Sequence, residues 1–305
     1  MEAKTNGHMR DFAVYTVCTG HYKYGLFALI KSLRKNYSGP IIIGTDKIMD
    51  EIANLDQVEQ VILQSDYVFG NLKSKLVIEQ PAKSFVFLDA DIIVINPIFI
   101  SFLRETLQKH NRLIVSAEAT IPQNDIRRLN WNVQNGIETK PVTNVVYNGG
   151  FFAGTYENHL PFLKQWQELI HKHLKPGEYL FANPDFPMAD QDIMNSILQN
   201  YPEDGLVAIS LPDWESTAVS VNPFYAVGRF KEQLFVHCTG KLKPWLIQKL
   251  PLRYPNLYDR LFFKYSTNAE LGIKSDLKFN KLQQLWFTES RLIPFYNKIR
   301  VLLNL

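Results

Sequence analysis

Short apolar runs alternate with amphipathic stretches through the first hundred residues. Runs of strand length lie at 13–18, 41–46, 58–64 and within 85–95. Stretches with helical character lie at 24–37, 47–56 and 72–82. Alternation every ~20–30 residues is typical of an α/β layered fold with a mostly parallel sheet. In such sheets ligand sites lie at the carboxyl ends of the strands, so we expect the chemistry to gather there.

The second half of the chain is less regular but continues the same kind of pattern. Its predicted strands are 112–119, 145–156, 206–212 and 233–240, and its predicted helices are 159–174 and 188–200. We expect a loop around Trp131 and Asn132, between the first two of these strands. No internal repeat or low-complexity linker divides the chain. The sequence therefore predicts one α/β domain of the Rossmann-like kind over 1–250 and a basic, aromatic helical tail over 251–305.

Composition and charge narrow the class of protein. With 305 residues, 46% hydrophobic and 21% charged, the chain has the balance of a soluble globular protein and not of a disordered or fibrous one. Its two cysteines, Cys18 and Cys238, lie far apart, which favours a reducing compartment. No apolar stretch approaches the ~18 residues of a membrane-spanning helix, and no signal-peptide core follows the polar N-terminus. We therefore expect a cytoplasmic protein, peripheral on the inner face of a membrane.

The charge is unevenly distributed along the chain. The net charge of +3 is weak support for any polyanionic partner, and no nucleic acid is expected. From residue 241 onward, however, twelve lysines and arginines face four acids, a net charge of +8. The tail thus predicts a surface that meets something anionic.

Two aspartates directly after an apolar strand are the first candidate for chemistry. Asp89 and Asp91 lie one residue apart and can share a hard divalent cation, and the small Ala90 between them lets a ligand approach. An isolated pair of this kind is usually a solvated strand end. Apolar residues on both sides change this interpretation, because a desolvated carboxylate pair is costly without a partner.

A second candidate is the segment HCTGKLKPW, at 237–245. A lone histidine at a strand end is more often structural than a metal ligand. Here His237 is followed by Gly240, whose turn lets backbone N–H groups approach an oxyanion, and by Lys243, a point charge for phosphate. We therefore expect a phosphate-binding loop and not a surface turn.

Two further segments are ambiguous from the residues alone. Asn148 and Gly149 could place a sugar close to the backbone, but Asn-Gly is also the commonest hairpin turn. Asp190, Gln191 and Asp192 stand near a helix start, where acids also act as caps. An Asp-Gln pair that is not a cap is suited to bind several hydroxyl groups of one sugar.

With these clusters in order, the sequence resembles the retaining GT-A glycosyltransferases of family eight, which include glycogenin and bacterial lipopolysaccharide galactosyl- and glucosyltransferases. The stretches that carry the resemblance are VYTVCTGHYKYGLFALIKSL, FLDADIIV, YNGGFFAG, ADQDIMN and HCTGKLKPW, and they span about residues 11–247. The last stretch has the family's H-x-x-G-x-x-K-P-W pattern at every fixed position, whereas D-x-D alone would not be specific.

The resemblance implies a role for each matching residue. It implies that Asp89, Asp91 and His237 bind Mn²⁺, with Mg²⁺ as the other candidate. It implies that Asp190, Gln191 and Asn148 act at the donor sugar. It further implies that the nucleotide-sugar donor is held by Thr16, Cys18, Thr19, Tyr22, Lys75, Asp89, Ala90, Asp91, Gly149, Gly240 and Lys243. The interval from Lys75 to Asp89 is shorter than in the family, and the loop around 120–145, where acceptor choice usually resides, diverges most.

The expected function is therefore transfer of a hexose, from UDP-glucose or UDP-galactose, to a glycan, lipid-linked or lipopolysaccharide acceptor. A metal and a lysine on the departing diphosphate would stabilise the transition state selectively. The residues do not choose between front-face attack and double displacement. A non-catalytic nucleotide-sugar or glycan-binding module and a D-x-D phosphatase remain the alternatives. The oligomeric state is left open.

The C-terminal segment supports a second partner, an anionic membrane surface. Between 281 and 305, apolar residues approximate one helical face, interrupted by Pro294, and aromatic and basic residues accompany them. Such a tail suits the headgroup boundary of an anionic bilayer. A helix packed on the catalytic domain or a dimer contact is the alternative interpretation.

Overall fold

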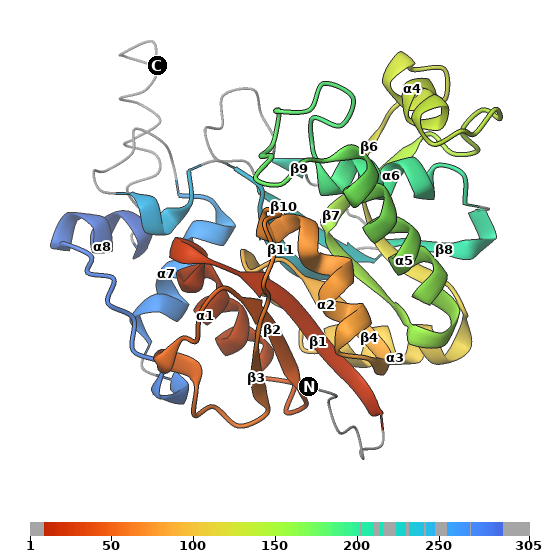
Figure 1. Cartoon of the computed structure of the whole chain (residues 1–305). Helices are drawn as coiled ribbons and strands as arrows, with labels where there is room; N and C mark the ends of the chain where they lie inside the picture. Colours follow the sequence, from red (N-terminus) through yellow and green to blue (C-terminus); the bar gives the residue numbers. More distant parts are fainter. Residues whose placement is uncertain are drawn as a thin grey trace, which may run out of the picture. The chain divides into compact units, whose positions relative to one another are not determined.

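The computed structural model describes residues 9–201, 203–209, 214–215, 224–229, 232–240, 242–247, 255–268 and 270–288. The chain forms two compact units, each made of several segments (Figure 1). The first unit comprises Met1–Thr19, Ser38–Asp89 and Ile100–Ser210. The second comprises Gly20–Tyr37, Ala90–Phe99 and Leu211–Leu305. A domain boundary near residue 250 stays a prediction.

A seven-stranded sheet forms the centre of the first unit. Its strands are β1 (Arg10–Cys18), β2 (Ile41–Thr45), β3 (Val58–Ile62), β4 (Ala82–Leu88), β6 (Leu113–Thr120), β7 (Val145–Thr155) and β8 (Leu206–Ile209). They lie in the order β3-β2-β1-β4-β7-β6-β8. Only β7 runs antiparallel to both of its neighbours. The predicted α/β fold with a mostly parallel sheet is therefore confirmed.

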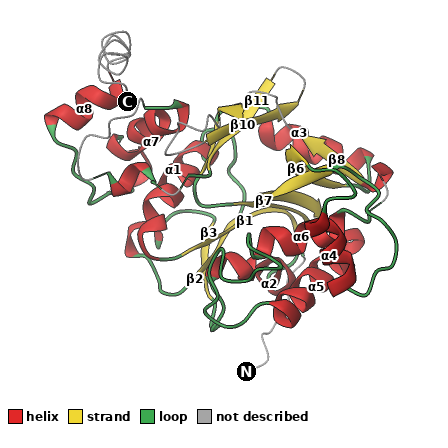
Figure 2. Ribbon diagram, turned by 90° about the horizontal axis from the view of Figure 1, so that it is seen from above, coloured by secondary structure: helices red, strands yellow, loops and turns green. Residues whose placement is uncertain are grey.

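The helices of the first unit are α2 (Lys73–Glu79), α3 (Phe99–Lys109), α4 (Ile126–Gln134), α5 (Tyr156–His173) and α6 (Asp190–Leu198). Of these, α2, α5 and α6 pack on the sheet, and α4 packs on α6. Figure 2 shows α2, α5 and α6 together on one face of the sheet. There the ring of Phe152 stacks on Phe87, with centroids 5.0 Å apart, and meets the ring of Trp166 edge-on. These fully buried aromatic rings anchor the core beneath the helices.

Two predicted elements of the first unit are wrong. The polar helix expected over 47–56 is only a short 3₁₀ turn at Asp50–Ile52. The loop expected around Trp131 is helix α4, which begins after Asp125, whose side chain accepts a hydrogen bond from the N–H of Arg127. A polar sequence with only one large buried ring in its middle gave no clear helical period.

The second unit is built on an antiparallel sheet with the order β5-β11-β10-β9. Its strands are β5 (Ile92–Val94), β9 (Trp214–Glu215), β10 (Phe224–Arg229) and β11 (Glu232–Cys238), and its helices are α1 (Lys23–Leu33), α7 (Leu257–Thr267) and α8 (Lys281–Thr288). Helix α1 contacts β5 and α7. A Cβ on Gly25 would lie 2.7 Å from the carbonyl oxygen of Ala90 and 2.8 Å from the ring of Trp245, so only glycine permits this approach.

The apolar segment 85–95 thus supplies strands to two different sheets. Strand β4 ends at Leu88, and β5 begins at Ile92. The three residues between them, Asp89, Ala90 and Asp91, are where the chain leaves the first unit and enters the second. No helix within the described ranges is long and apolar enough to cross a bilayer.

Candidate functional site

In the first unit, one buried lysine contacts two carboxylates and a backbone carbonyl group. Lys73, in the first turn of α2, places its ammonium 3.0 Å from a carboxylate oxygen of Asp89 and 2.9 Å from one of Asp190. It also donates a hydrogen bond of 2.9 Å to the carbonyl oxygen of Gly149. Burial opposes the charge, but Asp190 and Asp89 outweigh it and raise the pKa of Lys73. Lys73 is therefore a fixed positive charge shared by two carboxylates.

The middle of strand β7, around Asn148 and Gly149, packs closely against α6. Gln191 Oε1 accepts hydrogen bonds from the N–H of Gly149, at 2.9 Å, and from the side-chain amide of Asn148, at 3.2 Å. The amide nitrogen of Gln191 donates in turn to Glu118, at 2.7 Å. A Cβ on Gly149 would lie 3.1 Å from the Cβ of Gln191. The segment Asn148-Gly149 is therefore part of a strand held against Gln191, and not a hairpin turn.

The acids at the start of α6 have different roles. Asp192 accepts a hydrogen bond from the N–H of Met188, at 2.8 Å, and so holds the residues that precede the helix. Burial raises the pKa of Asp192 to about 6. Burial also raises the pKa of Asp190, whose side chain faces Lys73 while its carbonyl oxygen accepts from the indole N–H of Trp166. Asp192 therefore holds the residues before α6, whereas Asp190 joins the lysine cluster.

A second lysine–aspartate cluster lies inside the second unit. The two carboxylate oxygens of Asp91 meet different partners, Lys243 Nζ at 2.6 Å and His237 Nε2 at 3.1 Å. All three residues are buried. Burial alone would raise the pKa of Asp91, but Lys243 and then His237 overcome it and hold that pKa well below its usual range. Asp91 therefore stays ionised at any physiological pH.

The loop that carries Lys243 is braced by aromatic side chains. Lys243 also donates to the carbonyl oxygen of Cys238, at 2.5 Å, and its ammonium lies 5.7 Å from the ring centroid of Tyr22. The indole N–H of Trp245 donates to His21, at 3.1 Å, and the Trp245 ring meets Tyr22 edge-on. The lysine is therefore held in place by packing as well as by charge.

The remaining predicted donor residues lie in both units. Thr16 and Cys18 are buried on β1, and neither cysteine of the chain is in a disulfide. Within the second unit, Ala90 and Gly240 are buried. Lys75 stands apart from the lysine cluster of its own unit, because its ammonium lies 3.7 Å from Glu79 and 3.5 Å from the carbonyl oxygen of Gln64.

Sequence reasoning missed two residues of the first unit, Lys73 and Glu118. A signal for Lys73 was present in the chain. The buried positions of α2 include Lys73, Leu76 and Val77, with the spacing of one helical face, whereas Lys75 falls off that face. No comparable signal marks Glu118, because its contact with Gln191 joins residues 73 positions apart.

Comparisons with known proteins place this fold. No family model and no curated protein sequence matches the chain. Among solved structures, an active-site mutant of LgtC matches with a TM-score of 0.53 and 12% identity, covering 83% of this chain and 94% of that one. The glycosyltransferase GlyE of Streptococcus pneumoniae TIGR4 matches with a TM-score of 0.51 and 14% identity, covering 93% of this chain and 64% of GlyE. The chain thus has the GT-A fold of these proteins.

Proposed function

We propose that the protein is a metal-dependent, retaining glycosyltransferase that transfers a hexose from a nucleotide sugar to a glycan or glycolipid acceptor. One observation carries the proposal. The segment Asp89-Ala90-Asp91 presents two carboxylates, and each meets a buried lysine within its own unit, Lys73 for Asp89 and Lys243 for Asp91. On the GT-A fold, a pair of carboxylates with fixed cations suits the binding of a nucleoside diphosphate and its counter-ion.

The proposed metal ligands are Asp89, Asp91 and His237. Within the second unit His237 Nε2 lies 3.1 Å from Asp91, and Asp89 stands two residues before Asp91 in the sequence. Carboxylate oxygens with one imidazole are hard and borderline ligands, which suit Mn²⁺ or Mg²⁺. Such an ion would supply positive charge to the diphosphate as it departs. Lys243 would supply a second charge to the same group, and its braced loop would keep it there.

The donor sugar is proposed to lie against Asn148, Asp190 and Gln191. The amide of Gln191 is already oriented, because Glu118 accepts from its nitrogen and the N–H of Gly149 donates to its oxygen. A fixed amide with a buried carboxylate beside it can hold sugar hydroxyl groups and stabilise positive charge at the anomeric carbon. Retention of configuration and a UDP-glucose or UDP-galactose donor rest on the resemblance of the sequence motifs.

The proposed acceptor is a glycan, a lipid-linked glycan or a lipopolysaccharide at the inner face of a membrane, reached from the cytoplasm. The tail from residue 251 onward, with its basic and aromatic residues, is the part proposed to meet anionic lipid. The part of this tail beyond residue 288 lies outside the described residues.

Donor hydrolysis and transfer, measured with and without Mn²⁺, test the proposal. We expect turnover of a UDP-hexose that stops in excess chelator and returns with Mn²⁺. Lys243→Ala should lower kcat more than it raises KM, because its charge matters most as the diphosphate leaves. Lys75→Ala, the matched control on a half-exposed ion pair with Glu79, should behave as the wild type.

Two outcomes would contradict the proposal. Full turnover in excess chelator would exclude the metal role of Asp89, Asp91 and His237. Release of phosphate from simple phosphate esters, without any dependence on a sugar nucleotide, would instead favour a D-x-D phosphatase.

A further inference from the structure

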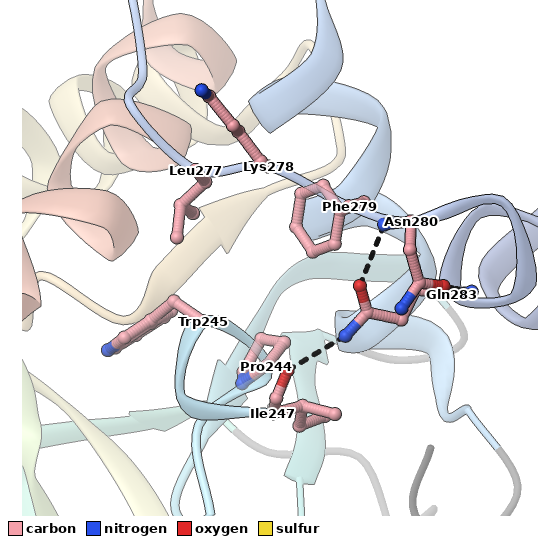
Figure 3. Close-up of a pocket in the computed structure, with 8 residues that line it drawn as sticks. All are labelled: Pro244, Trp245, Ile247, Leu277, Lys278, Phe279, Asn280 and Gln283. Atoms are coloured by element: carbon pink, nitrogen blue, oxygen red, sulfur yellow. Dashed lines mark hydrogen bonds between the residues drawn. The ribbon is translucent and has the colours of Figure 1, made fainter. Parts of the chain in front are cut away.

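The second unit contains a pocket that the proposed donor chemistry does not use. Its volume is about 510 Å³. Figure 3 shows the side chains that line it, which come from the turn after Lys243, from the segment before α8 and from α8 itself. They are Pro244, Trp245, Ile247, Leu277, Lys278, Phe279, Asn280 and Gln283. All of these belong to one unit, so the pocket is a property of that unit alone.

Hydrogen bonds hold the pocket in shape. Gln283 donates its amide N–H to the carbonyl oxygen of Ile247, at 3.0 Å, and accepts from the N–H of Asn280, at 2.9 Å. Asn280 Oδ1 accepts from the N–H of Gln283, at 2.9 Å, which caps α8. The ring of Phe279 packs edge-on against Phe263. The walls are therefore built before any ligand arrives, as is usual for binding pockets.

The lining has an apolar interior and a cationic rim. Five of the eight residues are apolar, including the two aromatic residues Trp245 and Phe279. Lys278 is exposed and directs its ammonium away from the other lining side chains (Figure 3). No hydrogen bond or ion pair engages that ammonium within the described segments. Two more exposed lysines, Lys274 and Lys281, lie close by in sequence. The nearby carboxylate of Asp276 lies 3.6 Å from the ammonium of Lys23.

We propose that this pocket binds the lipid part of an anionic, lipid-linked acceptor: an apolar chain in the interior and its phosphate at Lys278. An apolar cavity with a cation at one end is complementary to an amphiphile with an anion at one end. Leu246 and Leu282, beside the lining residues in sequence, are 41% and 63% exposed and extend the apolar surface. The inference rests on the proposed function only where it calls the ligand an acceptor. Binding of the ligand in the pocket does not require that function.

The pocket also adjoins the loop that holds the diphosphate-binding lysine. Pro244 and Trp245 line it and directly follow Lys243. An occupied pocket would restrain this turn, so we expect the lipid part of the acceptor to stabilise Lys243 in its position against Asp91.

The test measures binding of dodecyl phosphate, below its micelle concentration, by calorimetry with the full chain and without metal or nucleotide. Dodecyl maltoside, inorganic phosphate and vesicles of phosphatidylglycerol are the comparison probes. We expect dodecyl phosphate to bind, and Lys278→Glu to weaken it about tenfold. Leu277→Trp, which fills the interior, should weaken dodecyl phosphate and dodecyl maltoside alike.

Matched variants separate a pocket from a general surface effect. Lys264→Glu changes an exposed lysine of α7 outside the lining, and Leu285→Trp enlarges an exposed leucine of α8 outside it, so neither should alter binding. The proposal is overturned if both lysine variants weaken binding equally, if only vesicles bind, or if inorganic phosphate binds as well as dodecyl phosphate. If Leu277→Trp fails to fold, the exposed Lys278→Glu still decides the question.

The outcomes also separate this inference from the proposed function. If the protein binds dodecyl phosphate but turns over no nucleotide sugar, the proposed lipid-binding pocket is supported and the proposed transferase function is wrong. If the protein turns over a nucleotide sugar but does not bind dodecyl phosphate, only the proposed lipid-binding role of the pocket is wrong.

Discussion

The two lysine–aspartate clusters use the same residue types in opposite proportions. In the first unit one ammonium, that of Lys73, is shared by the carboxylates of Asp89 and Asp190. In the second unit one carboxylate, that of Asp91, is shared by Lys243 and His237. The first cluster therefore has surplus negative charge and the second does not. A cluster of the first kind can accept another cation or a cationic transition state, whereas one of the second kind keeps a single carboxylate ionised.

The largest expected effect comes from removing the shared carboxylate of the second cluster. Asp91→Asn leaves the buried ammonium of Lys243 without its counter-charge, and losing one partner of a buried pair costs about 3–5 kcal/mol. We expect the free energy of unfolding to fall by about that amount and sugar transfer to be lost. Urea unfolding and a transfer assay measure the two effects. Asp276→Asn, on an exposed partner of Lys23, is the control and should change neither.

Removing the shared cation of the first cluster should come next. Lys73→Met leaves Asp89 and Asp190 close to the same buried point without a positive charge, and we expect a loss of about 3 kcal/mol in unfolding free energy. Part of this loss should be recovered at low pH, because the two carboxylates can then take up protons. Lys75→Met should cost less than about 1 kcal/mol, since its ion pair with Glu79 is half-exposed. Equal effects of the two substitutions would show that Lys73 has no special role.

This pair of lysines shows where sequence reasoning succeeded and where it stopped. Asp91, His237 and Lys243 could be singled out because they fall in the D-x-D pair and in a short motif, HCTGKLKPW, but the contacts among them were not predicted. Lys75 was named from a match to a motif, whereas the buried lysine of α2 that meets Asp89 is Lys73. Glu118 could not be found, since a polar residue on a half-buried strand shows no partner until the fold places Gln191 opposite it.

The fold, too, could be predicted from the sequence in some parts and not in others. Buried strands such as β1 and β4 were predicted to within a few residues, because continuous apolar runs bounded by polar turns are strong signals. The segment 85–95 could not reveal that it serves two sheets, since an apolar run carries no information about which partner strand it will meet. Helix α4 was missed because Arg128, one of its buried residues, is charged and is held by Gln199 and a backbone carbonyl.

Asp192, a buried acid of the first unit outside the lysine cluster, should make the stability of the protein depend on pH. Its folded-state pKa of about 6 lies above the ordinary value of 3.8, so the folded protein binds this proton more tightly. The associated stability is complete below about pH 4 and is lost as the pH rises through 6, by about 2–3 kcal/mol. Asp192→Asn should remove this slope between pH 4 and 6 while keeping an oxygen that accepts from the N–H of Met188. Unfolding curves across that range measure it, and an unchanged slope would assign it to another group.

The smallest expected effect tests the orientation of Gln191. Glu118→Met keeps the approximate size of the side chain but removes the oxygen that accepts from the amide nitrogen of Gln191. The contacts of Gln191 Oε1 with Asn148 and Gly149 should then loosen, while the core and both lysine clusters stay intact. We expect kcat to fall about tenfold with KM for the donor little changed, since a positioning residue acts on geometry at the reacting carbon. Asp125→Asn, at the cap of α4, is the control outside this network, and its kinetics should match the wild type. A rise in KM without a change in kcat would mean that Glu118 binds the donor directly and does not position Gln191.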